Sequence, residues 1–172
     1  MKQQGLTLVE LLITIAISAI LLGIGVPGYS YLLNHSRLVG ITNEMVGALS
    51  LARSEAVKRG VRVTVCKGNP MMPMPSCQPS ATWEQGWLVF VDTGIPGELD
   101  GTDEIIRVRE AMEGEASIST SNFSKYVSYM PSGVSRGPNN LPNGSLSICL
   151  GGNLRKIVIN TTGRARLEKG VC

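Results

Sequence analysis

Residues 1–27 read MKQQGLTLVELLITIAISAILLGIGVP, and this stretch decides the organisation of the whole chain. Its apolar part, Leu6 to Val26, has 21 residues and contains one charged side chain, the carboxylate of Glu10. A helix of that length measures about 30 Å, which is enough to cross the hydrocarbon core of a bilayer. The rest of the 172-residue chain suffices for one ordinary domain. We therefore expect one membrane anchor followed by one globular head.

A cleavable secretory signal peptide is the alternative interpretation, because Lys2 gives a positive start and an apolar segment follows it. Three features argue against this alternative. The apolar run is longer than a signal-peptide core, it contains an acid, and its helical pattern continues past Pro27. The run is therefore interpreted as a membrane-spanning helix, because a helix satisfies its backbone hydrogen bonds within one segment.

The segment KQQGLTLVE, residues 2–10, resembles the processing site of type IV prepilins. Such sites have a short basic leader that ends in glycine, an apolar first mature residue and a glutamate at the fifth mature position. Here these positions are Gly5, Leu6 and Glu10. The resemblance implies that a prepilin peptidase in the membrane cuts after Gly5 on the cytoplasmic side and methylates the new amine of Leu6. It extends to Pro27, where many pilins carry a helix-kinking proline.

The carboxylate of Glu10 needs a cationic partner, because a lone carboxylate inside the membrane costs about 2.5–3.5 kcal/mol on insertion scales. Cleavage would create such a cation, the amine of Leu6. In a filament the amine of one subunit would meet Glu10 of a neighbour and set the axial register between them. The alternative is a glutamate that only reaches the lipid headgroups.

Beyond Pro27 apolar residues recur every three or four positions, which predicts an amphipathic helix that ends at Gly60. Its apolar face consists of Leu38, Ile41, Met45, Leu49, Ala52 and Ala56. After Gly60 the period changes to two, and short apolar runs alternate with clusters of Gly, Pro, Asn and Asp. These runs are VRVTVC, GWLVFVD, EIIRVRE, YVSYM, SLSICL and KIVIN.

We expect an α+β fold in which a long N-terminal helix packs on an antiparallel β-sheet head. The chain divides into a leader (1–5), a transmembrane or filament-core helix (6–27), and an amphipathic helix with the head (28–172).

The four cysteines Cys66, Cys77, Cys149 and Cys172 all lie in the head. The expected topology places the head outside the cytoplasm, where disulfides persist. Of the three connectivities that four cysteines allow, we favour Cys66 with Cys77 and Cys149 with Cys172, because each closes a local loop. A zinc site is the competing interpretation, but the sequence has no CxxC pair and only one histidine, His35, near the membrane.

The sequence contains no constellation typical of catalysis, because one histidine and four paired cysteines provide no nucleophile with a base beside it. The acids of the segment DTGIPGELDGTDE, residues 92–104, do not have the spacing of a calcium loop and are interpreted as solvated turn residues. We expect a protein that is not an enzyme and binds no metal or cofactor.

The head carries a narrower resemblance. The segments LARSEAVKRGVRVTVC, GWLVFVD and ICLGG followed by KIVINTTGRAR are similar to the GspH and FimT group of minor pilins and pseudopilins. Within them GRAR, Gly163 to Arg166, resembles the GRxR motif of FimT-type pilins, which bind DNA during natural transformation. Gly163 is suited to a positive φ, so a sharp turn and a returning strand would place Arg164 and Arg166 on the same side.

Charge is distributed unevenly along the head. Residues 84–115 carry nine acids and two arginines, whereas the residues from 155 onward carry one acid, Glu168. The basic residues of this last part are Arg155, Lys156, Arg164, Arg166 and Lys169. A polyanion would be drawn to the C-terminal end. The alternative is a basic face that is only solvated.

Two functions follow as hypotheses. In the first, the chain is a minor type IV pilin of the inner membrane of a Gram-negative bacterium, with its head in the periplasm before assembly. Its partners would be the prepilin peptidase, other pilins or pseudopilins, and DNA bound without sequence preference. In the second, the chain is purely structural, either a pilus-initiating minor pilin or a GspH-like pseudopilin of type II secretion.

Overall fold

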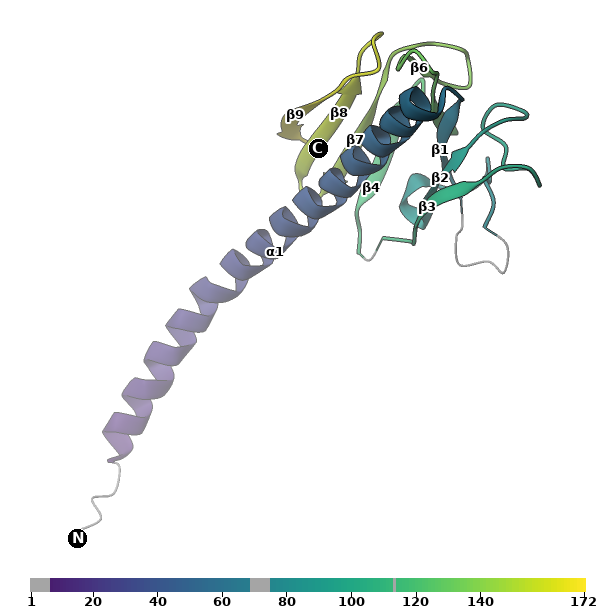
Figure 1. Ribbon diagram of the computed structural model, residues 1–172. Helices are drawn as coiled ribbons and strands as arrows, with labels where there is room; N and C mark the ends of the chain where they lie inside the picture. The colour runs from purple at the N-terminus through teal and green to yellow at the C-terminus, as the bar shows by residue number, and fades with distance from the viewer. Residues whose placement is uncertain (1–6, 69–74, 113) are drawn as a thin grey trace.

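The computed structural model describes residues 7–68, 75–112 and 114–172, without the side chains of residues 24–27. Gly5 and Leu6, the expected processing site, lie outside the described residues. The first element is a single helix of 52 residues, α1 (Leu8–Arg59). Figure 1 shows its first half extending away from the head and its second half lying against the strands. The predicted architecture, one long N-terminal helix on an antiparallel head, is confirmed.

Helix α1 begins and ends with standard capping geometry. The Thr7 hydroxyl accepts a hydrogen bond of 3.3 Å from the backbone N–H of Glu10. At the other end Gly60 has φ 68°, and its N–H donates to the Ala56 carbonyl at 3.0 Å, which confirms the predicted stop. The helix runs across position 27 without interruption, so the boundary placed there from the sequence stays a prediction.

The head contains two antiparallel sheets. The first has the order β3-β2-β1-β5-β6, with β1 (Val63–Lys67), β2 (Trp87–Val91), β3 (Ile105–Arg109), β5 (Tyr126–Tyr129) and β6 (Ser135–Arg136). The second has the order β4-β7-β8-β9, with β4 (Ser117–Ser121), β7 (Gly144–Leu150), β8 (Asn153–Ile159) and β9 (Ala165–Val171). A short 3-10 helix, η1 (Trp83–Gln85), precedes β2. The six apolar runs became strands, whereas β4 and β6 were not predicted.

The core lies between α1 and the inner faces of both sheets. All six residues of the predicted apolar face of α1 are buried. They pack in one cluster with residues of both sheets, among them Val89 and Val127 of the first and Ile148 and Ile157 of the second. Because α1 fills the space between the sheets, the helix is the element that holds the two halves of the head together.

Two disulfides close the head, with the same pairing that the sequence favoured. Cys66 is bonded to Cys77, and Cys149 is bonded to Cys172. The first bond ties the segment after β1 to that strand. The second ties the last residue after β9 to β7, two strands away in the same sheet. With their thiols oxidised, these four cysteines are not available as zinc ligands.

Candidate functional site

The hairpin of β8 and β9 carries the GRAR segment, and the side chain of Asn160 organises its turn. The Asn160 Oδ1 accepts hydrogen bonds from the backbone N–H of Thr162 at 3.2 Å and of Arg164 at 2.9 Å. The backbone N–H of Gly163 donates to the Asn160 carbonyl at 2.9 Å. The turn is therefore a closed, hydrogen-bonded structure that sets the direction in which Arg164 leaves the chain.

Gly163 must be glycine for two independent reasons. Its φ is 76°, the left-handed region that was expected from the sequence and that side chains disfavour. It also lies against the turn between β5 and β6, because a Cβ added at Gly163 would sit 2.1 Å from the carbonyl oxygen of Gly133. The glycine of the GRAR segment thus docks the hairpin onto the neighbouring sheet.

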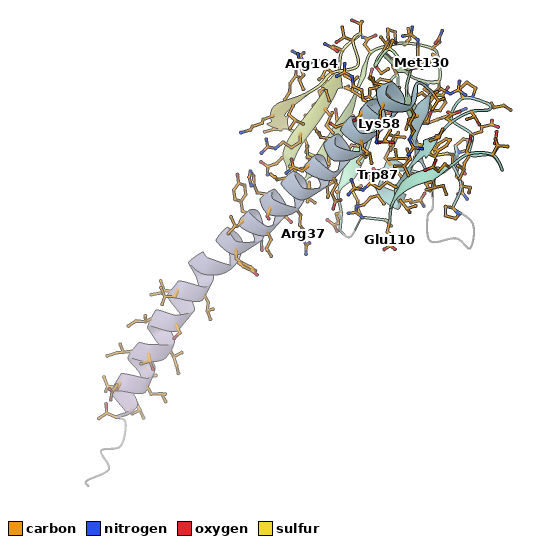
Figure 2. All side chains as sticks on the ribbon, in the orientation of Figure 1. Arg37, Lys58, Trp87, Glu110, Met130 and Arg164 are labelled. Carbon is orange, nitrogen blue, oxygen red and sulfur yellow. A yellow bond between two sulfur atoms is a disulfide. The ribbon has the colours of Figure 1, made fainter. Side chains whose placement is uncertain are left out.

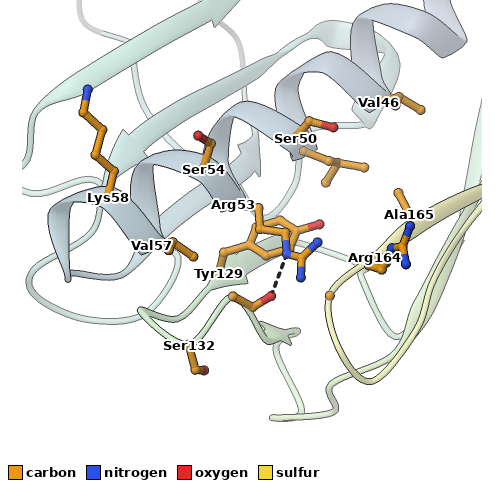
Figure 3. A pocket seen from close by; sticks show the side chains of 13 residues that line it. Val46, Ser50, Arg53, Ser54, Val57, Lys58, Tyr129, Ser132, Arg164 and Ala165 are labelled. Atoms are coloured by element: carbon orange, nitrogen blue, oxygen red, sulfur yellow. Dashed lines mark hydrogen bonds between the residues drawn. The ribbon is translucent and has the colours of Figure 1, made fainter.

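Arg53 of α1 holds both turns in place. Its Nε donates to the Gly133 carbonyl at 3.1 Å (Figure 3). Its Nη2 donates to the Thr162 carbonyl at 3.1 Å. Arg53 belongs to the ARSEA segment, so the two segments on which the resemblance of the head rests contact one another. This role could not be predicted from the sequence, because a side chain that binds backbone carbonyls 80 and 109 residues away leaves no spacing pattern.

The register of β8 and β9 divides the basic residues of the C-terminal part between the two faces of the second sheet. These residues are Arg155, Lys156, Arg164, Arg166 and Lys169. Ile157 and Ile159 of β8 are buried toward α1, so Lys156 lies on the outer face. Arg166 is paired with Val158 of that outer face. Arg164 lies just before β9 and opposite Asn160, where continued alternation would give it the same side as Arg166. Arg155 and Lys169 lie on the opposite face.

Arg155 and Lys169 are cross-strand partners on the α1 side of the sheet. The five basic residues therefore do not share one face of the sheet. Alternation alone separates Arg155 from Lys156, because neighbouring residues of a strand point to opposite faces. The candidate site reduces to Lys156, Arg164 and Arg166, with Gly163 as the residue that positions them.

The outer face of this sheet is largely polar, with a small hollow beside Lys156 that Ser121 and Ser145 help to line. Register places hydroxyl side chains next to the basic residues on it, from Ser117, Ser119 and Ser121 of β4 and from Ser145 and Ser147 of β7. No aromatic residue of the described strands lies on this face. The face therefore offers hydrogen-bond donors and positive charge, which suit anionic oxygen atoms.

One acid lies within the basic group. The Nη2 of Arg166 is 2.9 Å from the Oε1 of Glu168, with both side chains largely exposed. Register also places Glu168 directly opposite Lys156. Glu168 therefore offsets part of the positive charge of the outer face.

A surface cavity of about 740 Å³ separates α1 from the hairpin. Figure 3 shows Arg164 on one side of it, Lys58 on the other and Arg53 between them. No acid lines it, and Ser50, Ser54 and Ser132 add hydroxyl groups. Burial raises the pKa of the Tyr129 phenol at its floor, and the charge of Arg53 opposes this shift. The cavity extends the cationic surface from Arg164 toward the helix.

The anchor half of the chain is exposed. Glu10 and the apolar residues of the first part of α1 are solvent-accessible. Figure 2 shows side chains projecting outward around this half of the helix, which extends away from the head. This half contains a helical segment that is long and apolar enough to cross a membrane. Within the residues that the structure describes, no group of three His, Cys, Asp or Glu side chains is arranged to hold a metal ion.

The sequence profile of the family described as Type II transport protein GspH matches residues 42–163, well over half of the chain. The chain belongs to the GspH family. The prokaryotic N-terminal methylation motif matches residues 1–26. This motif implies processing by a prepilin peptidase, and the family assembles into filaments.

Two known proteins illustrate the relationship. The pilin-like protein PilA1 of Thermus thermophilus is 28% identical over 174 residues, covering 98% of this chain and 100% of the relative. Two crystal structures of the type IV minor pilin FimU of Pseudomonas aeruginosa have a similar fold, with TM-scores of 0.55 and 0.57 and identities of 16% and 15%. They cover 78% and 81% of this chain and 91% and 90% of FimU.

This GspH-family chain is a minor pilin or pseudopilin of a type IV pilus or a type II secretion system. Such subunits are structural and not enzymes. The exposed apolar half of α1 has the length and composition of a membrane anchor, in keeping with a pilin-type subunit that assembles into a filament.

Proposed function

We propose that this chain is a minor type IV pilin whose β8–β9 hairpin binds DNA without sequence preference during natural transformation. The feature that supports this most directly is the β8–β9 hairpin, which carries Arg166 and Lys156 on one face and Arg164 just before β9. The hairpin is held by Arg53 at its turn and by a disulfide at its other end. Such cations are positioned before a ligand arrives.

The chemistry of the outer face fits phosphate more than bases. Guanidinium groups bind phosphate oxygens through paired hydrogen bonds, and residues two apart on a strand are about 7 Å from one another. The described outer face has neither an aromatic ring for stacking on a base nor a helix that fits the major groove. Binding should therefore be weak per subunit, indifferent to sequence and steeply dependent on salt.

The same proposal places the chain in the inner membrane of a Gram-negative bacterium, with its head in the periplasm. Two disulfides in the head support an oxidising compartment. The prepilin peptidase would cut after Gly5 and methylate the amine of Leu6. In the filament that amine would pair with the exposed Glu10 of a neighbour.

A purely structural subunit, either a pilus-initiating pilin or a pseudopilin of type II secretion, is the second candidate. One observation favours it: Glu168 lies 2.9 Å from Arg166 and opposite Lys156, so part of the basic group already has an anionic partner. In this alternative the GRAR segment serves only to dock the hairpin through Gly163.

The test is DNA binding by the mature full-length chain in detergent micelles, measured by fluorescence anisotropy with a labelled duplex at several salt concentrations. We expect R164Q/R166Q to weaken binding about tenfold or more and to reduce the salt slope by about 2. The matched control is R155Q/K169Q, which removes the same charge from the opposite face and should change affinity about twofold or less.

Two outcomes contradict DNA binding at this site. Equal losses in both double variants would mean that net charge alone attracts DNA. Absence of binding by the parent at about 50 mM salt would favour the structural subunit.

A further inference from the structure

Strand β9 is an open edge of the second sheet. It lies last in the order β4-β7-β8-β9, and all seven of its residues are exposed. Its register with β8 continues from Asn153 to Ile159 without a shift, and it contains no proline. Bulges and prolines are two of the devices that protect an edge strand against pairing with another chain, and β9 has neither. It does carry charged side chains, which make its pairing selective for the charge of the partner strand.

The hydrogen-bonding groups on the free side of β9 can be assigned. The Asn160 N–H donates to the Arg164 carbonyl at 3.1 Å, and the Cys172 N–H donates to the Gly152 carbonyl at 3.1 Å. Hydrogen-bonded and non-hydrogen-bonded pairs alternate along an antiparallel ladder. The backbone N–H and C=O groups of the even-numbered residues between Arg164 and Cys172 therefore bond to β8. The outward N–H and C=O groups belong to Ala165, Leu167, Lys169 and Val171.

The edge is rigid, because both of its ends are fixed. Gly163 docks against Gly133 at the turn, and Arg53 holds the Thr162 carbonyl. At the other end the disulfide joins Cys172 to Cys149 of β7. A strand that is already extended and fixed loses little conformational entropy when a partner strand pairs with it.

One N–H of the opposite edge of the sheet already has a partner. The outward N–H of Ile118 in β4 donates to the side-chain carboxylate of Glu84 in η1. The Glu84 carbonyl also accepts a hydrogen bond of 2.8 Å from Met112, which holds the chain before β4 beside η1. The fold therefore blocks pairing at Ile118 and leaves β9 open.

The open edge adjoins the surface by which the subunit packs in a filament. Figure 1 shows the C-terminus on the side of the head from which the exposed half of α1 emerges. Beside it, the turn between β8 and β7 lies against Asn34 of α1, since a Cβ added at Gly151 would be 3.0 Å from the Asn34 Nδ2. Val171 is 83% exposed and Leu167 is 48% exposed, and Leu32 on the adjacent helix surface is 64% exposed.

We propose that β9 accepts an extended segment of a neighbouring filament subunit, which becomes the fifth strand of this sheet. Main-chain hydrogen bonds to Leu167 and Lys169 supply the pairing. The segment carries apolar residues next to Leu167 and Val171, and acidic or hydroxyl residues next to Arg166 on the outer face. A basic strand such as β3, with Arg107 and Arg109, would be repelled.

Pairing between two copies of β9 does not fit this arrangement. Antiparallel self-pairing requires a two-fold axis perpendicular to the sheet, which would also reverse the direction of the α1 that lies on it. The two anchors would then leave in opposite directions, whereas subunits of one membrane or one filament have parallel anchors. The partner is therefore a different segment of a neighbour.

The first experiment compares L167P with L167T in cells that produce the complete set of pilins. Proline removes an outward N–H and leaves the ladder to β8 intact, whereas threonine keeps that N–H and shortens the side chain. We expect L167P to lower the share of the chain in sheared filaments about fivefold or more, and L167T to change it about twofold or less. Thermal unfolding and disulfide content of each variant serve as controls for the fold.

The second experiment needs no variant, so it tests the pairing of β9 with a neighbouring subunit even if L167P fails to fold. Amide hydrogen exchange is measured on the parent chain in detergent and in filaments. We expect the outward amides of Leu167 and Lys169 to slow about tenfold or more on assembly, and those of Arg166 and Glu168 to be slow in both states. Unchanged exchange of the outward amides in filaments would overturn the proposal. DNA binding in detergent is independent of this outcome, because it uses the outer face.

Discussion

The Nη2 of Arg53 donates a hydrogen bond of 3.1 Å to the carbonyl oxygen of Thr162, and this contact joins α1 to a turn that lies 109 residues further along the chain. The same guanidinium binds Gly133 in the other sheet at 3.1 Å. A single side chain therefore connects the helix to both sheets. The position of Arg164 depends on this connection, because Arg164 follows the turn directly.

Replacing Arg53 with methionine keeps the aliphatic stem and removes both hydrogen bonds. Two carbonyl groups lose a charged donor, so the unfolding free energy should fall by about 1–3 kcal/mol. Denaturant unfolding of the full chain in detergent measures the change. R107M, at an exposed arginine of β3, is the control and should shift it by no more than about 0.5 kcal/mol. Equal effects of the two substitutions would contradict the role of Arg53.

Replacing Gly163 with alanine should destabilise the head by more than about 1 kcal/mol, because it combines a positive φ with a close approach to Gly133. Gly152 is the matched control. It has φ 78°, yet no atom lies within 4 Å of an added Cβ, so G152A reports the backbone strain alone. The difference between the two variants in thermal unfolding measures the docking contact. No difference would mean that the hairpin can move away from Gly133 without cost.

Replacing Glu168 with glutamine should strengthen DNA binding about threefold, because it releases Arg166 and removes a negative charge opposite Lys156. The measurement is the anisotropy titration described above for the parent. E98Q makes the same charge change at an exposed acid between β2 and β3 and should have little effect. A similar gain in both variants would point to net charge in place of the local arrangement.

Replacing Glu10 with alanine should spare processing and impair assembly, because the peptidase cuts the chain after Gly5 while the carboxylate acts between subunits. Mass spectrometry should find a mature chain that begins at Leu6, and the share in sheared filaments should fall. A bulky residue at Gly5 should instead leave the uncut precursor in the membrane. Normal incorporation of E10A would remove the assigned role of Glu10.

The carboxylate of Glu55 should give the head an acid-sensitive contribution to stability. The Arg59 guanidinium, whose Nε lies 2.5 Å from the Glu55 Oε2, holds the pKa of Glu55 below its ordinary value. A lowered pKa stabilises the fold above the ordinary carboxyl value of about 4.3, and this contribution is lost as the pH falls below it. E55Q should show a smaller fall in thermal midpoint over that range, and an unchanged fall would contradict the assignment.

Periodicity was enough to predict α1 and the apolar strands, because their burial repeats at fixed spacing. The predicted face of α1, from Leu38 to Ala56, is the buried face. Strand β4 was missed because SISTS has one large apolar residue, Ile118, and its other side chains are serine and threonine. The division into two sheets was missed because the order of pairing depends on contacts across the head.

The candidate site was predicted in part. The positive φ of Gly163 followed from the conformational freedom of glycine. The shared side of Arg164 and Arg166 stays a prediction from strand alternation. Arg155 and Lys169 were grouped with them by charge alone, although alternation already separates Arg155 from Lys156. The role of Arg53 could not be predicted, because its hydrogen-bond partners are backbone carbonyl groups, which every residue type has.

The carboxylate of Glu84 on the Ile118 N–H has a consequence for how heads can associate. In a four-stranded antiparallel sheet the two edge strands, here β4 and β9, run in opposite directions. When identical heads stand side by side with parallel anchors, β9 of one head would therefore lie antiparallel to β4 of the next and could pair with it. If both edges were open, heads could add to one another without limit, as in a cross-β aggregate. Glu84 occupies an N–H in the middle of one of them and opposes pairing there. Repeated pairing of heads through this sheet is thereby disfavoured, and the length of an assembly is left to the packing of the helices.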